Sequence, residues 1–287
     1  MENIKIKLCA FSDEANPSLD GQIAALKRNN ISYMEMRGVD GKNVTALTFE
    51  EAKAVKEKLD ANGIQVWAIG SPLGKVDIHT DFDEYIKLVR HTCQLANLLE
   101  TKRIRVFSFF NAYDEREKVF SYLNKMAKIG AEYGVQMYHE NEKGIYGDVA
   151  QRVKDIMENT TGLKFVYDPA NYLQCGETDA DVTLDMLHET TEYFHIKDVK
   201  VATGVTVPAG YGDGKIEKLV SLITSDKTLT LEPHLRVFEG YANIDDTEMK
   251  HEYTYDSADE AFDAAVAALK KVLNEAGYKE IDGVFIK

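Results

Sequence analysis

GVQMYHENEKGIYGDVAQRVKDIMENTTGLKFVYD (residues 134–168) is one full repeat of the pattern that decides the fold. Its segments 135–140 and 163–168 are short runs rich in β-branched, aromatic and aliphatic residues, which predicts two strands. The stretch between them carries apolar residues at helical spacing. Gly134 and Gly162 stand where a helix would end in a left-handed cap before each strand. The stretch therefore predicts a strand, a helix and a second strand.

The same alternation extends along the whole chain, so the strand–helix unit is repeated. Strands are predicted over 4–11, 31–36, 64–70, 103–110, 135–140, 163–168, 192–197 and 228–232. Between Phe82 and Ala96 the apolar residues recur at steps of three and four, and the last helix is expected to begin at a Ser257 cap. Such alternation indicates a parallel sheet.

Two architectures alternate in this way, a doubly wound sheet and a closed barrel. No glycine-rich phosphate loop follows the first strand, where the sequence is FSDEANPSLD (11–20), which argues against the doubly wound sheet. Eight units in 287 residues suit the barrel, whose usual size is roughly 250 residues. We therefore expect an α/β protein with a single (β/α)8 TIM barrel, forming one domain over residues 1–287.

Composition excludes several classes of function. The formal charge of −14 would repel phosphate backbones, so we expect no nucleic-acid partner. No apolar run is long enough for a membrane span, and the N-terminal segment lacks a secretory pattern. The three cysteines are scattered and suit packed thiols in a reducing compartment, so we expect a cytoplasmic protein.

Four consecutive predicted strands end in a side chain that can bind a metal ion. These side chains are Glu140, Asp168, His195 and Glu232, with separations of 28, 27 and 37 residues. Each separation is about one strand–helix unit, so all four should meet at the carboxyl-terminal mouth of the barrel. Isolated loop acids and a core histidine are the alternative interpretation. Four such residues in register on successive strands favour a metal site.

Three carboxylates and one imidazole form a hard, oxygen-rich ligand set. We predict one divalent metal ion, with Mn²⁺, Mg²⁺ or Co²⁺ suited to the set and Zn²⁺ also compatible.

Three further residues at the mouth are candidates for substrate binding: Lys197, Asn171 and His234. For Lys197 the alternative is an ion pair with Asp198 or another neighbouring acid, and for His234 the alternative is packing in the loop. The glycine-rich segment 208–214 lacks a P-loop lysine and is expected to lead into the next helix.

These motifs resemble the xylose isomerase-like TIM barrel superfamily, which includes sugar isomerases, ketose 3-epimerases, inositol-catabolism enzymes and an endonuclease of AP endonuclease family 2. The resemblance covers essentially the whole chain. It rests on SPLGK (71–75), RVFSFF (105–110), HENEKGIYGD (139–148), DPAN (168–171), HIKD (195–198) and LEPHL (231–235), in this order and spacing.

The resemblance implies that Glu140, Asp168, His195 and Glu232 are the metal ligands. It also implies that Glu140 and Glu232 exchange protons with a substrate from opposite faces. A metal chelated by a carbonyl and an adjacent hydroxyl would acidify the neighbouring C–H and stabilise an enediolate, with the two carboxylates as base and acid. We therefore predict a metal-dependent isomerase or epimerase of a sugar, sugar phosphate or related polyol.

Other functions in the superfamily stay open or are disfavoured. The endonuclease branch has extra histidines where this chain has Gly70-Ser71, Phe109-Phe110 and Asn171, so its trinuclear zinc cluster is not expected. Asn171 also differs from the residue that many ketose epimerases have at this position. A dehydratase or lyase acting on an inositol-derived keto compound, or a non-catalytic sugar-binding barrel, are the alternatives.

The segment 236–255 is longer than a simple connection between a strand and a helix, and loops of that length are usually functional. We expect it to cover the mouth or to contact a partner subunit, with a solvated excursion as the alternative. The sequence leaves a homodimer open.

Overall fold

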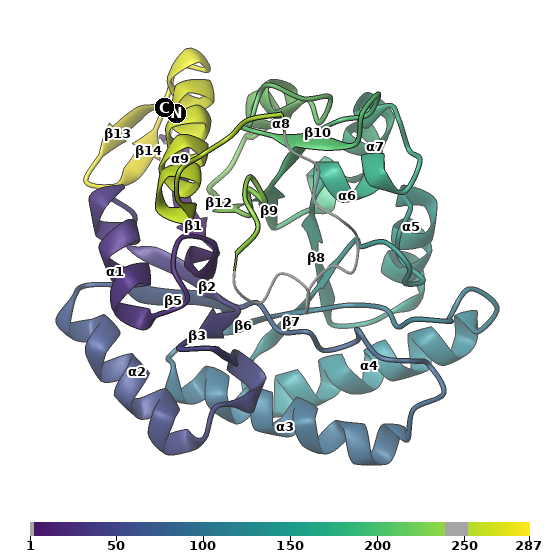
Figure 1. The fold of residues 1–287 in the computed structure, drawn as a ribbon. Helices are drawn as coiled ribbons and strands as arrows, with labels where there is room; N and C mark the ends of the chain where they lie inside the picture. The colour runs from purple at the N-terminus through teal and green to yellow at the C-terminus, as the bar shows by residue number, and fades with distance from the viewer. Residues whose placement is uncertain (1–2, 239–251) are drawn as a thin grey trace.

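Eight parallel strands close into a barrel in the computed structural model, which describes residues 3–238 and 252–287 (Figure 1). The strands of the barrel are β1 (Lys5–Ala10), β2 (Tyr33–Met36), β5 (Gln65–Ile69), β6 (Arg103–Val106), β7 (Gln136–Glu140), β8 (Leu163–Tyr167), β9 (Tyr193–Ile196) and β12 (Lys227–Leu231). Neighbours in this order pair in parallel, and β12 pairs with β1 to close the barrel. The predicted (β/α)8 barrel is confirmed.

The helices surround the barrel, as Figure 1 shows. They are α1 (Leu19–Arg28), α2 (Phe49–Ala61), α3 (Phe82–Leu98), α4 (Arg116–Glu132), α5 (Ala150–Asn159), α6 (Pro169–Gln174), α7 (Ala180–Leu187), α8 (Ile216–Ser221) and α9 (Ala258–Glu275). The Ser257 hydroxyl accepts a hydrogen bond from the Glu260 amide at the start of α9, as the sequence predicts. Gly134 and Gly162 both have the positive φ expected after α4 and α5.

Short antiparallel hairpins are added to this frame, and the sequence pattern did not predict them. They are β3 (Gly38–Val39) with β4 (Lys42–Asn43), β10 (Asp198–Lys200) with β11 (Val205–Val207), and β13 (Lys279–Ile281) with β14 (Val284–Ile286). Strand β14 also pairs with the start of β1, and the two chain ends lie close together (Figure 1). The buried Phe285 anchors this C-terminal hairpin on the barrel.

Strand β6 ends at Val106, whereas the sequence predicts a strand as far as residue 110. Beyond it, the backbone bonds with the loop that follows β5. The Phe107 amide donates to the Leu73 carbonyl at 2.7 Å and the Phe109 amide to the Gly74 carbonyl at 2.9 Å. Phe109 has a φ of 69°, which interrupts the extended conformation. The apolar run therefore continues as an ordered loop over the mouth.

The interior of the barrel is polar, in contrast to the aliphatic interior of many such barrels. Successive side chains of a strand point to opposite faces, so residues two apart share a face. On β9 the inward residues are Tyr193 and His195, and both contact Glu35 of β2 on the other side of the barrel. The apolar core lies instead between the strands and the helices, where Val89, Cys93 and other residues of α3 are buried.

The segment 208–214 leads into α8, as the sequence predicts. Its turn is organised by the buried carboxylate of Asp198, which accepts hydrogen bonds from the amides of Gly210, Gly212 and Gly214 at 2.9–3.0 Å. A Cβ on Gly212 would lie 2.3 Å from Asp198 Oδ1, so this position has no room for a side chain. Asp198 is thus used by the backbone and does not pair with Lys197.

Cys9, Cys93 and Cys175 are all free thiols. Within the described residues, no helix combines the length and apolar character that crossing a membrane requires.

His139 of β7 is fully buried on the helix-facing side of the strand, next to Phe165 and Gly147. Neither ring nitrogen has a hydrogen-bond partner among the described residues. Burial lowers the pKa of His139 to about 3, because a charged imidazole would be poorly solvated there. The folded protein therefore holds this ring neutral over a pH range in which the unfolded chain protonates it.

This difference predicts an acid sensitivity that depends on one residue. Because the pKa of His139 is lower in the folded state, the free energy of unfolding should decrease as pH falls below about 6.5 and continue to decrease toward pH 3. Between pH 7 and pH 5 the loss should be about 2 kcal/mol. Denaturant unfolding of wild type and His139→Leu at both pH values measures it, and equal losses in the two proteins would contradict the prediction.

Candidate metal centre

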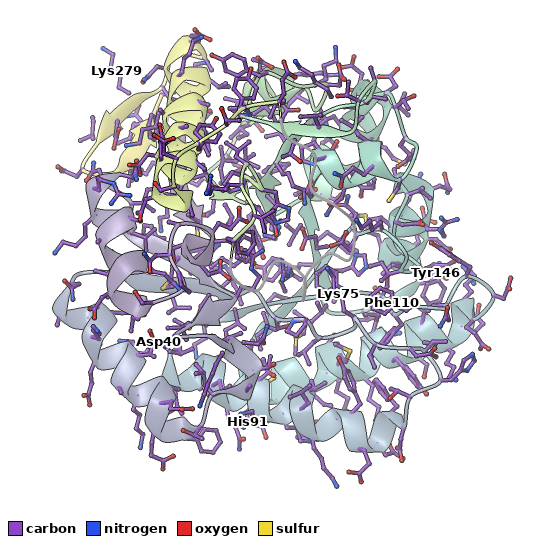
Figure 2. The ribbon with its side chains drawn as sticks, viewed as in Figure 1. Asp40, Lys75, His91, Phe110, Tyr146 and Lys279 are labelled. Carbon is purple, nitrogen blue, oxygen red and sulfur yellow. The ribbon has the colours of Figure 1, made fainter. Side chains whose placement is uncertain are left out.

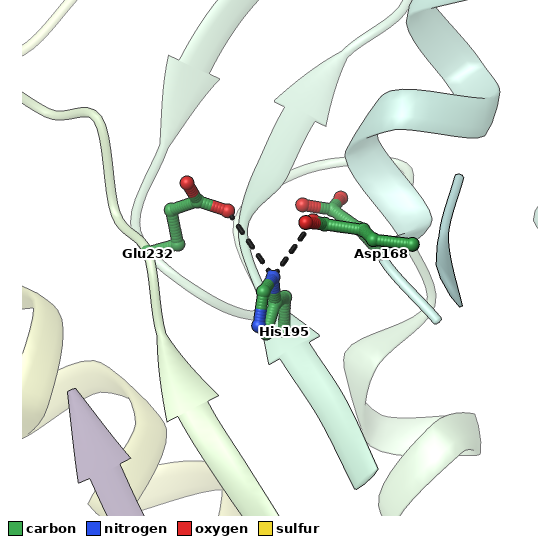
Figure 3. A group of neighbouring side chains, drawn as sticks. Asp168, His195 and Glu232 are labelled. Carbon is green, nitrogen blue, oxygen red and sulfur yellow. Dashed lines mark hydrogen bonds and ion pairs between the residues drawn. The ribbon is translucent and has the colours of Figure 1, made fainter. Parts of the chain in front are cut away.

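Glu140, Asp168, His195 and Glu232 meet at the carboxyl-terminal mouth of the barrel. Glu140 is the last residue of β7, Asp168 follows β8 as the N-cap of α6, His195 lies on β9, and Glu232 follows β12. Each offers a ligand atom, and these four atoms lie within 4.8 Å of one another. All four side chains are buried, and Figure 3 shows Asp168, His195 and Glu232 converging. The structure thus brings together the whole predicted set.

The two glutamates each use one oxygen toward His195 and the other toward an arginine. Glu140 places Oε1 2.7 Å from His195 Nδ1 and Oε2 3.1 Å from Arg105. Glu232 places Oε2 3.4 Å from the same Nδ1 and Oε1 2.9 Å from Arg37. The arginines therefore fix both carboxylates with one oxygen directed into the cluster.

Asp168 is held in a similar way from its own side of the mouth. Its Oδ1 accepts a hydrogen bond from the Asn171 amide at 3.0 Å, which caps α6. Its buried Oδ2 accepts no hydrogen bond from the described residues and lies 3.1 Å from Lys197 Nζ. An oxygen that is held by an ion pair alone, beside other oxygens and an imidazole nitrogen, can also coordinate a metal ion.

The electrostatics of the cluster also favour a cation. Burial, with a smaller contribution from repulsion by Glu232 and Glu140, raises the pKa of Asp168 to about 7 against the attraction of Lys197. Burial alone would lower the pKa of His195, yet the field of Glu140 and Glu35 raises it well above the ordinary value. The cluster therefore attracts positive charge, which a divalent ion would supply, and the residues present fit such an ion.

A cavity of about 200 Å³ lies beside the cluster, on the side of β1 to β6. Its charged walls include Arg37 and Arg105, the same residues that hold Glu232 and Glu140. Lys75, labelled in Figure 2, also lines the cavity and contacts Glu142 at 2.7 Å. Phe107 and Phe238 supply apolar wall. The cavity thus offers a small compartment with charged and apolar walls next to the candidate metal ligands.

Lys197 points into the mouth, two residues beyond His195 on the same face. Its ammonium lies 3.1 Å from Asp168 and 3.8 Å from Glu232, and not beside Asp198. Burial would lower the pKa of Lys197, but these acids raise it well above the ordinary value, so the side chain is charged.

Asn171 and His234 are also brought to the mouth. The Asn171 side-chain amide donates to the Asn141 carbonyl at 2.9 Å, so it joins the loops after β7 and β8. His234 Nε2 lies 3.4 Å from Glu14 and 3.6 Å from Glu232. Glu14, Glu232 and His234 form a second group of potential ligands, but Arg37 already contacts both glutamates. Substrate contact by Asn171, His234 and Lys197 stays a prediction.

Sequence reasoning missed the charged residues that surround the four ligands. They are Asp13, Glu14, Glu35, Arg37 and Arg105. Burial raises the pKa of Glu14 to about 8, against the attraction of Arg37. The strand sequences could have identified some of these residues. YMEMR (33–37) and RIRV (103–106) each place two charged residues two positions apart within an otherwise apolar strand. Such alternation indicates a polar inward face.

The predicted loop 236–255 falls largely outside the described residues, since 239–251 are not described. Near the start of this loop, the ring centroid of Phe238 lies 5.0 Å from the guanidinium carbon of Arg37, and Phe238 lines the cavity. Whether the rest covers the mouth stays a prediction.

The model of the xylose isomerase-like TIM barrel family matches residues 23–236. The chain belongs to this family. No curated protein is similar enough in sequence to count as a relative. Among solved structures, the IOLI protein with a bound zinc atom has a TM-score of 0.71 at 14% identity, covering 94% of this chain and 99% of that one.

Two other similar structures show how varied the chemistry on this fold is. The D-allulose 3-epimerase from Methylomonas sp. has a TM-score of 0.70 at 11% identity, covering 94% of this chain and 98% of the epimerase. The probable 3-DHS dehydratase AsbF from Bacillus anthracis has a TM-score of 0.66 at 16% identity, covering 92% and 97%. At these identities the similarity shows the fold alone.

The geometry predicts that the purified protein binds about one divalent ion per chain. Replacing His195 by alanine removes the single imidazole of the cluster and should weaken binding of Mn²⁺ sharply. Elemental analysis after Mn²⁺ soaking and dialysis measures the stoichiometry for both proteins. Wild-type protein that retains no metal after soaking would contradict the assignment of this cluster as a metal centre.

Proposed function

We propose that this protein is a divalent-metal-dependent isomerase or epimerase of a sugar, sugar phosphate or related polyol. The observation that carries the proposal is the buried convergence of Glu140, Asp168, His195 and Glu232 beside a cavity with charged walls. Membership of the xylose isomerase-like family and the likeness to a D-allulose 3-epimerase support it. Mn²⁺, Mg²⁺ or Co²⁺ suits the ligand set, and Zn²⁺ is compatible.

A bound ion would polarise a substrate carbonyl and an adjacent hydroxyl and so acidify the neighbouring C–H. The protein's own part is to move the proton. We assign Glu140 and Glu232 as the two carboxylates that act as base and acid. Each has one oxygen fixed by an arginine, Arg105 for Glu140 and Arg37 for Glu232, which limits rotation of the reacting carboxylate.

Lys197 is assigned to a substrate oxygen, because its buried ammonium is charged and lies beside Asp168. Asn171 and His234 are assigned to the edge of the substrate site. Of these two, His234 is nearer to Glu232, at 3.6 Å.

A dehydratase or lyase acting on a keto compound is the second candidate, and one observation favours it. The probable 3-DHS dehydratase AsbF shares the fold over 92% of this chain. The same base and acid would then remove a proton and a hydroxyl group as water. A panel of ketoses, aldoses and their phosphates, incubated in D₂O, separates the candidates. Exchange of a substrate C–H supports the isomerase, net loss of water the dehydratase, and binding without either a sugar-binding barrel.

Changing Glu140 or Glu232 to glutamine should separate catalysis from metal binding. An amide oxygen still coordinates a metal ion, so part of the metal should be retained. The amide is not a base at neutral pH, so solvent deuterium exchange should fall about 10²- to 10⁴-fold. Exchange rates measured at saturating Mn²⁺ give the size of the effect.

Asp168→Asn is the matched control, because Asp168 is assigned as a ligand without a role in proton transfer. Its loss of exchange should follow its loss of metal and should recover with excess Mn²⁺. Full recovery of both glutamine variants under the same conditions would exclude the two-carboxylate mechanism. The base would then lie elsewhere, and His234 or Glu14 would be examined next, since Lys197 is held charged.

A further inference from the structure

Glu35 is a carboxylate buried in the middle of the barrel. It lies on β2 with 1% of its surface exposed, and burying a charged group is costly unless it is paired or hydrogen-bonded. Among the described residues, its side-chain hydrogen bonds come from β9, on the other side of the barrel. Glu35 Oε2 lies 3.0 Å from His195 Nε2, and the Tyr193 hydroxyl donates to Oε1 at 3.4 Å. The burial of Glu35 thus depends on β9.

The backbone directs this contact. The pairing of β2 with β5 shifts register between Met34 and Glu35, so that Trp67 is passed over and Glu35 pairs with Ala68. Such bulges re-aim the side chain next to them. On β9, Tyr193 and His195 are two residues apart and share the inward face. The carboxylate and the imidazole are therefore placed opposite each other by both strands.

The two nitrogens of His195 have different surroundings. Nε2 meets Glu35, whereas Nδ1 lies 2.7 Å from Glu140 and 3.4 Å from Glu232. A carboxylate can only accept a hydrogen bond, so in the metal-free cluster both ring nitrogens donate, Nε2 to Glu35 and Nδ1 to Glu140. Because Nδ1 faces the candidate ligand carboxylates, a bound metal ion would replace the proton on Nδ1, while Nε2 would keep its hydrogen bond to Glu35.

We propose that Glu35 is a positioning residue for the metal centre, which orients His195 and fixes its tautomer so that Nδ1 is the coordinating atom. A metal-binding histidine commonly donates its second ring N–H to a carboxylate in this way. Glu35 is outside the group of four ligands, so it acts through His195. The inference rests on the metal-binding part of the proposed function and does not depend on the reaction.

The test compares three variants of the full chain. Glu35→Gln keeps an acceptor oxygen of nearly the same shape, and Glu35→Leu removes it. Tyr193→Phe is the matched control, because it deletes the other contact of Glu35 and leaves the contact with His195. The dissociation constant for Zn²⁺ is measured by competition with a chromophoric chelator. The visible spectrum of the Co²⁺-loaded protein and the melting temperature of the metal-free protein are recorded in parallel.

Glu35→Leu should weaken Zn²⁺ binding about 10- to 100-fold, the usual effect of losing such a partner. Glu35→Gln should restore part of the affinity, and Tyr193→Phe should stay close to wild type. The Co²⁺ spectrum should change in Glu35→Leu, because the imidazole is no longer oriented. A purely structural role would lower melting temperatures without this order of metal affinities.

Equal Zn²⁺ affinity in folded wild type, Glu35→Gln and Glu35→Leu overturns the proposal. If Glu35→Leu fails to fold, the decision falls on Glu35→Gln, where unchanged affinity together with an unchanged Co²⁺ spectrum overturns it. Wild type that binds Zn²⁺ but exchanges no substrate proton would refute the proposed reaction and leave the role of Glu35 intact. Wild type that binds no metal would refute both.

Discussion

The mouth of this barrel buries more acidic than basic side chains, and the architecture of the site follows from that constraint. Within the described residues there, the buried acids are Asp13, Glu14, Glu35, Glu140, Asp168 and Glu232, and the buried cations are Arg37, Arg105 and Lys197. Buried charges are stable only when paired, hydrogen-bonded or bound to a metal. Each cation accordingly contacts at least one ligand carboxylate. A divalent ion among the remaining oxygens would complete this balance.

The fold could be predicted because its signal is repeated. Every predicted strand of the barrel is present, and the errors lie at ends such as β6, where Phe109 adopts a positive φ and the chain bonds with a loop. The hairpin of β13 and β14 was missed because β13 has the sequence KEI (279–281), which is exposed throughout and gives no buried strand pattern, although Phe285 of β14 is buried. The convergence of the four candidate ligands could also be predicted, because parallel strands bring their carboxyl ends to one rim.

The surrounding network could not be predicted in the same way, because its partners are far apart in sequence. Arg37 contacts Glu232 across 195 positions, and Glu35 contacts His195 across 160. Period-two charges in YMEMR (33–37) indicate an inward polar face, but not which acid each cation meets. Asn171 illustrates the same limit. Its place at the rim was predicted, whereas its bond to the Asn141 carbonyl depends on how two loops meet.

The two halves of the barrel contribute differently to the site. The ligands come from β7 to β12, whereas the cavity walls come mainly from the segments around β1 to β6. The ion pairs that join the halves include those of Arg105 with Glu140 and of Arg37 with Glu232. Because both arginines line the cavity, a substrate group placed there also meets the residues that orient the ligand carboxylates. We therefore expect the half with the candidate ligands to determine the class of chemistry and the cavity half to determine which molecule is bound. Such a division would allow one fold to host different reactions, and this fold is similar to that of both an epimerase and a dehydratase.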